Sequence, residues 1–201
     1  MNSHEKFKNV EEEDFKISED VQKQLENLGL ETSDFSGKIL DVGAGEAFFA
    51  EELSQKEGVD ITSLDNNVPD DRKDKVIEGS VANLPFEDES FDLVISHASI
   101  PNIFIELYDF DEDKSNESKK EIESAIDRAF SEILRVLKPG GEARLSPIAL
   151  AENYSSQKAL KEAILNSLKK IDVEVDFQFM ETHKNPDNQE ESDFYRLIIK
   201  K

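Results

Sequence analysis

Residues 38–50 read KILDVGAGEAFFA, and the fold predicted for the chain is built outward from this stretch. Residues 39–42 form a short, largely apolar run, which is typical of a strand buried on both faces of a parallel sheet. Gly43 and Gly45 then interrupt the run, and from Glu46 the sequence is typical of a helix. A strand, a glycine turn and a helix N-terminus in succession let the backbone approach a ligand closely, because glycine has no side chain to keep the ligand away.

The residues after the second glycine indicate which ligand the turn accepts. A dinucleotide-binding turn has a third glycine where this chain has Phe48, and the carboxylate of Glu46 would repel a pyrophosphate. Residues 41–47, DVGAGEA, resemble instead the first motif of the class I S-adenosylmethionine-dependent methyltransferases, a Rossmann-like family. Many members have a third glycine in place of Ala47. The family's cofactor carries a sulfonium and an ammonium but no phosphate, so an acidic turn is compatible with it.

Two further segments resemble the same family and follow in the family's order. Residues 84–94, LPFEDESFDLV, are similar to the segment that leads into the fourth strand, and residues 135–141, RVLKPGG, are similar to the turn before the fifth. Strand patterns over 173–179 and 194–199 close the chain. The resemblance covers residues 36–200 and implies an α/β fold: a Rossmann-like three-layer sandwich with a mostly parallel seven-stranded sheet and an antiparallel C-terminal hairpin strand.

Helical patterns divide the chain into an extension and one domain. Ser18 is placed as the N-cap of a helix whose apolar stripe ends before Gly29, and a longer stripe runs over residues 118–137. We therefore expect residues 1–35 to be an N-terminal helical extension and residues 36–201 to be a single methyltransferase domain.

The resemblance also implies which residues hold the cofactor, S-adenosylmethionine. They are Asp41, Gly43, Ala44 and Gly45 for the methionine end, Asp65 and Asn66 for the ribose, and Ser80 and Val81 for the adenine. Many members have an aspartate where this chain has Ser80.

The position of Asp65, taken together with the glycine turn, also favours the ribose role. This residue ends the predicted second strand, residues 58–65, and follows Gly45 by about 20 residues, where Rossmann-like folds place a carboxylate against the ribose hydroxyls. The alternative is a strand-end aspartate that caps the following turn.

Ser96 and His97 follow the predicted fourth strand. Carboxyl ends of strands in an open parallel sheet face the ligand crevice, so we expect Ser96 to complete the cofactor pocket and His97 to border the methyl acceptor. His97 is the candidate catalytic residue, as a general base or as a group that orients the acceptor, and a plain wall position is the alternative. Methyl transfer needs little acid–base chemistry, because alignment of donor and acceptor supplies most of the rate.

Residues 106–120 form an acidic insertion without glycine. Tyr108 and Phe110 within it either cover the acceptor as a lid or anchor a solvated loop. The acidic residues lack the spacing of a calcium loop, so no metal is expected.

Composition narrows the possible partners. The chain has 201 residues, no cysteine and a formal charge of −22. Such a charge opposes binding to nucleic-acid phosphates, so we expect a small-molecule acceptor. The absence of cysteine is compatible with a reducing cytoplasm, and the sequence has neither a membrane-spanning apolar run nor a signal-peptide core.

Two other functions stay open at this point. One is a protein of the same fold that binds S-adenosylmethionine or acts as a scaffold without catalysis, because Ala47 and Ser80 depart from the family pattern. The other is a nicotinamide- or flavin-dependent oxidoreductase on a related fold, which Glu46 and Phe48 disfavour.

Overall fold

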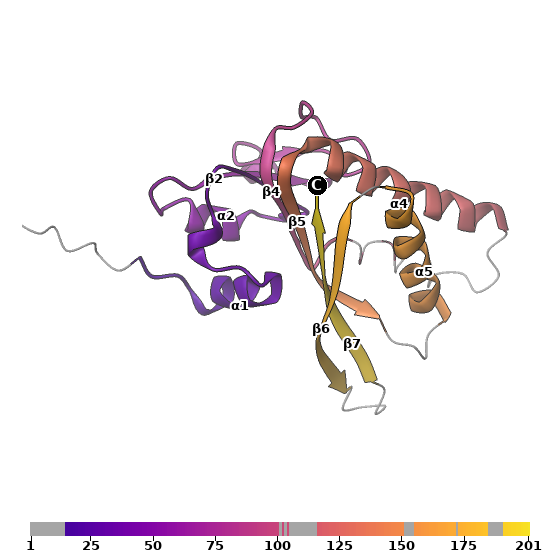
Figure 1. Cartoon of the computed structure of the whole chain (residues 1–201). Helices are drawn as coiled ribbons and strands as arrows, with labels where there is room; N and C mark the ends of the chain where they lie inside the picture. The colour runs from indigo at the N-terminus through magenta and orange to yellow at the C-terminus, as the bar shows by residue number, and fades with distance from the viewer. Residues whose placement is uncertain are drawn as a thin grey trace, which may run out of the picture.

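A computed structural model describes residues 15–100, 102, 104, 116–150, 155–171, 173–184 and 191–201. Its centre is a seven-stranded sheet with the strand order β3-β2-β1-β4-β5-β7-β6 (Figure 1). The strands are β1 (Lys38–Val42), β2 (Asp60–Asp65), β3 (Val76–Glu78), β4 (Phe91–His97), β5 (Leu137–Leu150), β6 (Glu174–Lys184) and β7 (Glu191–Lys200). The α-helices are α1 (Glu19–Leu28), α2 (Phe48–Leu53), α4 (Asn116–Val136) and α5 (Ser155–Lys169).

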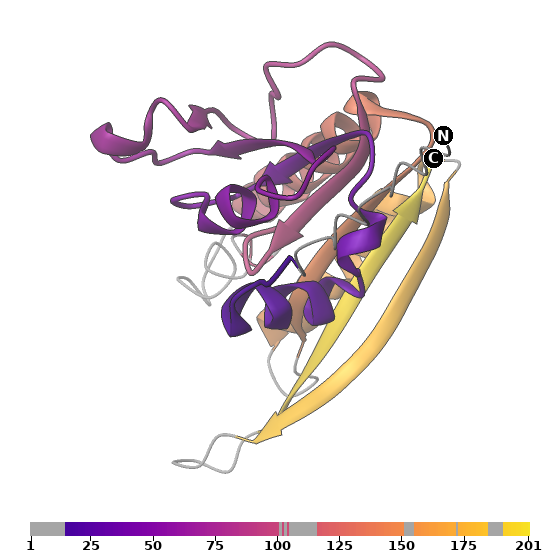
Figure 2. The same ribbon diagram turned by 90° about the vertical axis from the view of Figure 1, so that its left-hand side faces the viewer.

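Strand directions confirm the predicted fold class. The pairs β1–β2, β1–β4, β2–β3 and β4–β5 are parallel, whereas β7 runs antiparallel to both β5 and β6. Strand β1 is an interior strand between β2 and β4, which agrees with its run of buried residues. The closing hairpin of β6 and β7 is longer than the sequence pattern indicates, and Figure 2 shows it reaching beyond the helical layers.

Helices cover both faces of the sheet. Helices α1 and α2 share one core with Ile39, Leu93 and Ile95, whereas α4 and α5 share the other core with the oppositely directed Leu40 and Val94 (Figure 2). Alternate residues of β1 and β4 therefore enter different cores, as expected for strands buried on both faces.

Helix α1 has the predicted ends and packs on the sheet face. The Ser18 hydroxyl accepts a hydrogen bond from the backbone N–H of Val21, and Gly29 ends the helix with a φ of 65°. The expected apolar stripe of this helix is buried in the same core as α2. Packing against the sheet, and not propensity alone, holds such a short helix in place.

The helix after the glycine turn begins later than the sequence predicts. We expected it from Glu46, but α2 starts at Phe48 because Ala47 has a left-handed conformation with a φ of 62°. The turn therefore places three left-handed residues, Gly43, Gly45 and Ala47, at alternate positions. Ala47 stands where many members of the family have glycine, and its conformation explains that preference because an L-residue pays a steric cost there.

The outer edge of the sheet has little helical cover. No α-helix lies between Asp65 and Phe91, a stretch that the structure describes throughout. Its one helical element is a 3₁₀ turn at Asp70–Arg72. Strand β3 pairs only with β2, and Ile77 is 41% exposed.

Arg135 joins the two longer family-like segments to each other. From α4 it donates hydrogen bonds to the carbonyl oxygens of Leu84 (3.0 Å) and Phe86 (2.8 Å), and it pairs with Asp88 (2.7 Å) and Glu132 (2.8 Å). Glu132 in turn accepts a hydrogen bond from the N–H of Leu84. The guanidinium thus fixes the irregular segment before β4 onto the last turns of α4.

We predict that Arg135→Met, which keeps the apolar stem and removes the donors, lowers the free energy of unfolding by about 2 kcal/mol, because carbonyls and the Glu132 carboxylate lose their partner. Urea unfolding followed by circular dichroism measures this loss. Arg128→Met is the matched control on the same helix, since the one hydrogen bond of Arg128 among the described residues goes to the exposed Ser124 hydroxyl, and its effect should stay within about 0.5 kcal/mol. Equal losses in the two variants would contradict the assigned role of Arg135.

Candidate functional site

The glycine turn brings backbone amides to the carboxyl end of β1. The N–H groups of Gly43 and Ala44 both donate to the carbonyl oxygen of Leu64 on β2, at 2.8 and 3.1 Å. A Cβ placed on Gly43 would collide with the Ser99 hydroxyl, whereas a Cβ on Gly45 would meet nothing within 4 Å. Backbone at Gly45 therefore has open space beside it, and Gly43 is required for close packing against the residues after β4.

Asp65 lies directly against this turn. One carboxylate oxygen accepts the backbone N–H of Gly45 at 2.9 Å, and the other accepts that of Asn67 at 2.9 Å. The turn-capping alternative is therefore present in the structure. The same carboxylate stands beside the open space at Gly45, so that capping and ligand binding are compatible roles for one side chain.

Asp41 is the buried carboxylate of the site, with 4% of its surface exposed. Burial, and secondly the nearby negative charge of Asp65, raise the pKa of Asp41 from 3.8 to about 7. No hydrogen-bond donor to its carboxylate is found within the described residues. A cation beside Asp41 would stabilise its ionised carboxylate and so oppose both effects. This end of the turn therefore favours a positively charged ligand.

A pocket of about 70 Å³ opens beside the turn. Gly43, Asp65, Asn66, Ser80 and Val81, all predicted as cofactor residues, lie together in its wall. The lining also includes residues that were not singled out from the sequence, namely Val42, Leu64, Gly79, Ser99 and Ile100.

The predicted adenine-binding residues form a tight turn. Ser80 accepts a hydrogen bond at its hydroxyl from the N–H of Ala82 at 3.2 Å, and it forms an isolated bridge with Asn83. This turn follows β3 and places Val81 in the wall of the pocket. Three strands, β1, β2 and β3, therefore contribute their carboxyl ends to one pocket, which is where open parallel sheets bind ligands.

Residues after β4 fill much of the crevice. A typical ligand pocket has a volume of about 300–1,000 Å³, well above that of the pocket seen here. Ser99 packs on Gly43, and the Ile100 N–H donates to the buried Ser96 hydroxyl at 3.0 Å. Ala98, with a φ of 55°, makes the sharp turn that brings these residues back over the site.

Several predicted residues lie outside the pocket wall. Asp41, Ala44 and Gly45 belong to the same strand and turn without lining the pocket, and Ser96 is buried behind Ile100. The predicted lid aromatics Tyr108 and Phe110 lie outside the described residues.

His97 ends β4 at the same edge of the sheet and is half-buried. Burial alone lowers the pKa of His97 below 6.5, so the imidazole is neutral near pH 7. Its Nε2 atom lies 3.0 Å from Nδ2 of Asn27, which comes from α1. Sequence reasoning missed Asn27, and its half-buried position beside the apolar stripe of α1 was the available signal.

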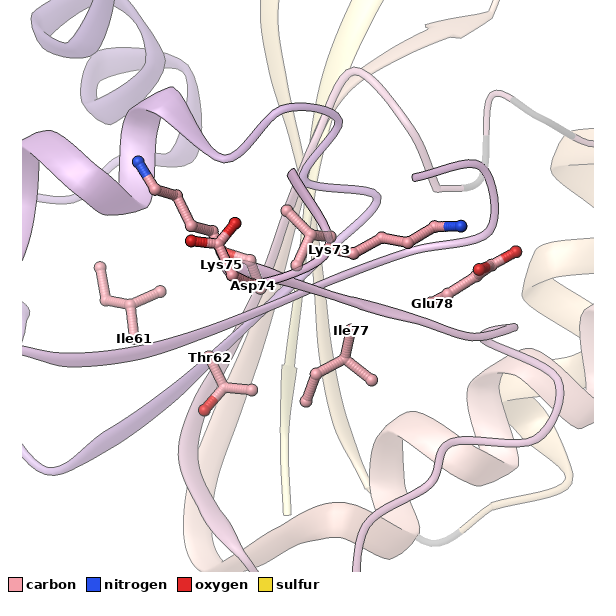
Figure 3. Close-up of a pocket in the computed structure, with 9 residues that line it drawn as sticks. Ile61, Thr62, Lys73, Asp74, Lys75, Ile77 and Glu78 are labelled. Atoms are coloured by element: carbon pink, nitrogen blue, oxygen red, sulfur yellow. The ribbon is translucent and has the colours of Figure 1, made fainter. Parts of the chain in front are cut away.

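Two larger hollows lie elsewhere and lack this chemistry. One of about 470 Å³ follows the outer edge of the sheet, where Figure 3 shows Thr62 and Ile77 on one side of the strands and Lys73 and Lys75 on the other. The second, of about 580 Å³, lies between α2 and β2. Residues from the middle of strands line both hollows, so neither has the converging strand ends of the pocket at Asp65.

Within the described residues, no group of three or more histidine and carboxylate side chains could hold a metal ion. Among the described helices, none is both long and apolar enough to cross a membrane.

Comparisons with known proteins agree with this geometry. The chain is similar to sterol 24-C-methyltransferase erg6 of Schizosaccharomyces pombe, at 24% identity in an alignment 132 residues long that covers 59% of this chain but only 30% of that protein's length. It superposes on an S-adenosylmethionine-dependent methyltransferase from Methanosarcina mazei with a TM-score of 0.56 and 15% identity, covering 92% of this chain and 98% of the other.

A third similar structure contains ligands. Phosphoethanolamine N-methyltransferase 2 of Haemonchus contortus, in complex with phosphomonomethylethanolamine and S-adenosylhomocysteine, matches with a TM-score of 0.51 and 16% identity, covering 90% of this chain and 52% of that chain. At such identities the structural likeness shows the fold. A family model described as a methyltransferase domain matches residues 40–145, just over half of the chain. The chain therefore belongs to the methyltransferase-domain family and has the fold of S-adenosylmethionine-dependent methyltransferases, as its sequence motifs predicted.

Proposed function

We propose that this protein transfers the methyl group of S-adenosylmethionine to a small-molecule acceptor by in-line displacement. The observation that carries the proposal is the contact of Asp65 with the glycine turn, at the edge where the carboxyl ends of β1, β2 and β3 converge. The bound cofactor supplies an electrophilic methyl group on its sulfonium. The protein's task is then to hold that group and the acceptor in line, which accounts for most of the rate in such reactions.

The residues of the turn suit the charges of the cofactor. Asp41 is a buried carboxylate without a donor in the described part of the chain, so the ammonium or sulfonium of the methionine end would supply the missing positive charge. Asp65 would accept hydrogen bonds from the ribose hydroxyls, with Asn66 beside it in the pocket wall. Ser80 and Val81 would contact the adenine from the turn after β3, and Gly43, Ala44 and Gly45 would supply backbone.

The pocket must widen when the cofactor binds, because about 70 Å³ is too small for a nucleoside. Ser99 and Ile100 are the residues that have to move, since they cover Gly43 and the end of β4. Ser96 holds Ile100 through a single hydrogen bond, which costs little to break.

A small molecule is the acceptor that the charge of the protein favours. A formal charge of −22 opposes the phosphates of DNA and RNA, and the absence of cysteine suits a reducing cytoplasm. His97 would touch the acceptor at the end of β4 and orient it as the catalytic residue. A neutral imidazole can do this because one ring nitrogen donates a hydrogen bond and the other accepts one.

The first prediction concerns the ribose. Asp65→Ala should weaken binding of S-adenosylhomocysteine by about 1–3 kcal/mol, because charge-assisted hydrogen bonds are lost. Isothermal titration calorimetry measures the affinity. Asp60→Ala is the control at the opposite, exposed end of the same strand, and it should leave the affinity unchanged. Unchanged affinity in folded Asp65→Ala would contradict the ribose role, and no binding to the unaltered protein would remove the proposal.

The second prediction concerns Asp41 and pH. In the free protein the pKa of Asp41 is raised to about 7, and a bound cation stabilises the ionised carboxylate, so binding releases a proton below that pH. Affinity for S-adenosylmethionine should therefore rise as the pH increases from 5.5 to about 7 and level off above it. Calorimetry across this range tests the slope, and Asp41→Asn should remove it. A slope that is the same in both proteins would show that Asp41 does not meet the cation.

A further inference from the structure

The contact between Asn27 and His97 determines where the histidine carries its proton. The side-chain nitrogen of Asn27 lies 3.0 Å from Nε2 of His97. An amide nitrogen only donates hydrogen bonds, so Nε2 must accept with its lone pair. The single proton of the neutral ring is then on Nδ1, since a neutral imidazole has one N–H and one lone pair.

An arginine from β7 holds the backbone of Asn27 in place. Arg196 on β7 donates from Nε to the carbonyl oxygen of Asn27 and from Nη2 to that of Glu26, both at 2.6 Å. Arg144 on β5 donates from Nη1 to the carbonyl oxygen of Gly29 at 2.7 Å. Carbonyl groups at a helix C-terminus lack partners within the helix and carry partial negative charge, so cations stabilise them well.

These contacts leave α1 little freedom to shift along the sheet. A Cβ on Gly29 would collide with the Arg196 guanidinium, so only glycine allows this close approach. The apolar stripe of α1 is buried against the sheet on the same side. The end of α1, and with it Asn27, is therefore fixed relative to the strands that flank His97.

Among the residues that the structure describes, no charged group competes with Asn27 for the imidazole. Strand β4 carries His97, α1 contributes the Asn27 amide, and β5 places Ser146 beside His97 in register. Desolvation lowers the pKa of His97, and no carboxylate or cation of the described residues contributes to this shift. Arg144 and Arg196 are engaged with carbonyl groups of α1, and Arg144 also pairs with Glu142.

We propose that Asn27 is a positioning residue, which holds His97 as the neutral tautomer protonated on Nδ1 so that the ring offers the methyl acceptor an N–H donor. The proposal rests on the proposed function, because the acceptor is placed at the end of β4. In this arrangement Nε2 is occupied by Asn27, and no free lone pair is left on the ring. His97 therefore orients the acceptor by donating a hydrogen bond and does not remove a proton from it.

The test observes the His97 ring directly by two-dimensional ¹H–¹⁵N NMR on the full chain without cofactor. The chain has two other histidines, His4 and His183, and His97→Gln identifies the His97 signals by their disappearance. We expect Nδ1 to be protonated and Nε2 to be unprotonated at pH 7.5. A titration of the same signals gives the pKa of the ring.

Two variants of Asn27 separate positioning from packing. Asn27→Leu removes the donor at similar size, and we expect a mixture of tautomers. Asn27→Asp replaces the donor by a carboxylate, which accepts only, so the proton should move to Nε2 and the pKa of His97 should rise by at least one unit. Gln22→Leu, which removes an exposed amide from the same helix, is the control and should change neither property.

Three results would overturn the proposal: an unaltered protein protonated on Nε2, a mixture of tautomers in that protein, or Asn27 variants that keep the tautomer and pKa of the unaltered protein. Backbone spectra establish that each variant is folded. The NMR measurement needs neither cofactor nor acceptor, whereas the proposed function fails through absent binding of S-adenosylhomocysteine. The two failures are therefore distinguishable.

Discussion

The hydrogen bond from the Gly45 backbone to the Asp65 carboxylate is the constraint on which the site depends. It joins the turn after β1 to the end of β2, and these residues stand 20 positions apart in the chain. Parallel pairing brings the two strand ends together, and the open space at Gly45 keeps the amides of the turn accessible. Burial, and secondly the charge of this same carboxylate, raise the pKa of Asp41, so the inner end of the turn favours a cation.

The family-like segments outside the site act as a framework for it. Arg135 fastens the segment before β4 to α4. Asp92 accepts hydrogen bonds from the backbone N–H of Lys38 at 2.8 Å and from the Lys138 ammonium at 2.7 Å, and these partners hold the pKa of Asp92 below its usual range. The starts of β1, β4 and β5 are thus tied together, at the sheet end opposite the pocket. The family-like segments that contain Arg135, Asp92 and Lys138 therefore have a structural role in the sheet, and no catalytic role is needed to explain them.

Helix α1 contributes to the site although it precedes the family-matched segment. Arginines from β5 and β7 bind its terminal carbonyl groups, and its apolar stripe completes one of the two cores. This docking brings Asn27 to His97 across a separation of 70 residues. With the proposed function, this arrangement would suit a histidine that orients a substrate and does not remove a proton from it.

The sequence by itself determined the fold class and the grouping of Asp65, Ser80 and Val81 through its resemblance to a methyltransferase family. It determined the glycine turn and the limits of α1 through local patterns, because turns and helix caps depend on neighbouring residues. The tertiary structure decided what depends on contacts between distant residues. It showed the left-handed Ala47 that delays α2, the packing of Ser99 and Ile100 over the turn, and the hydrogen bond between Asn27 and His97. The alternation of a strand and the 3.6-residue period of a helix do not encode such contacts, since they arise only when separate elements dock against one another.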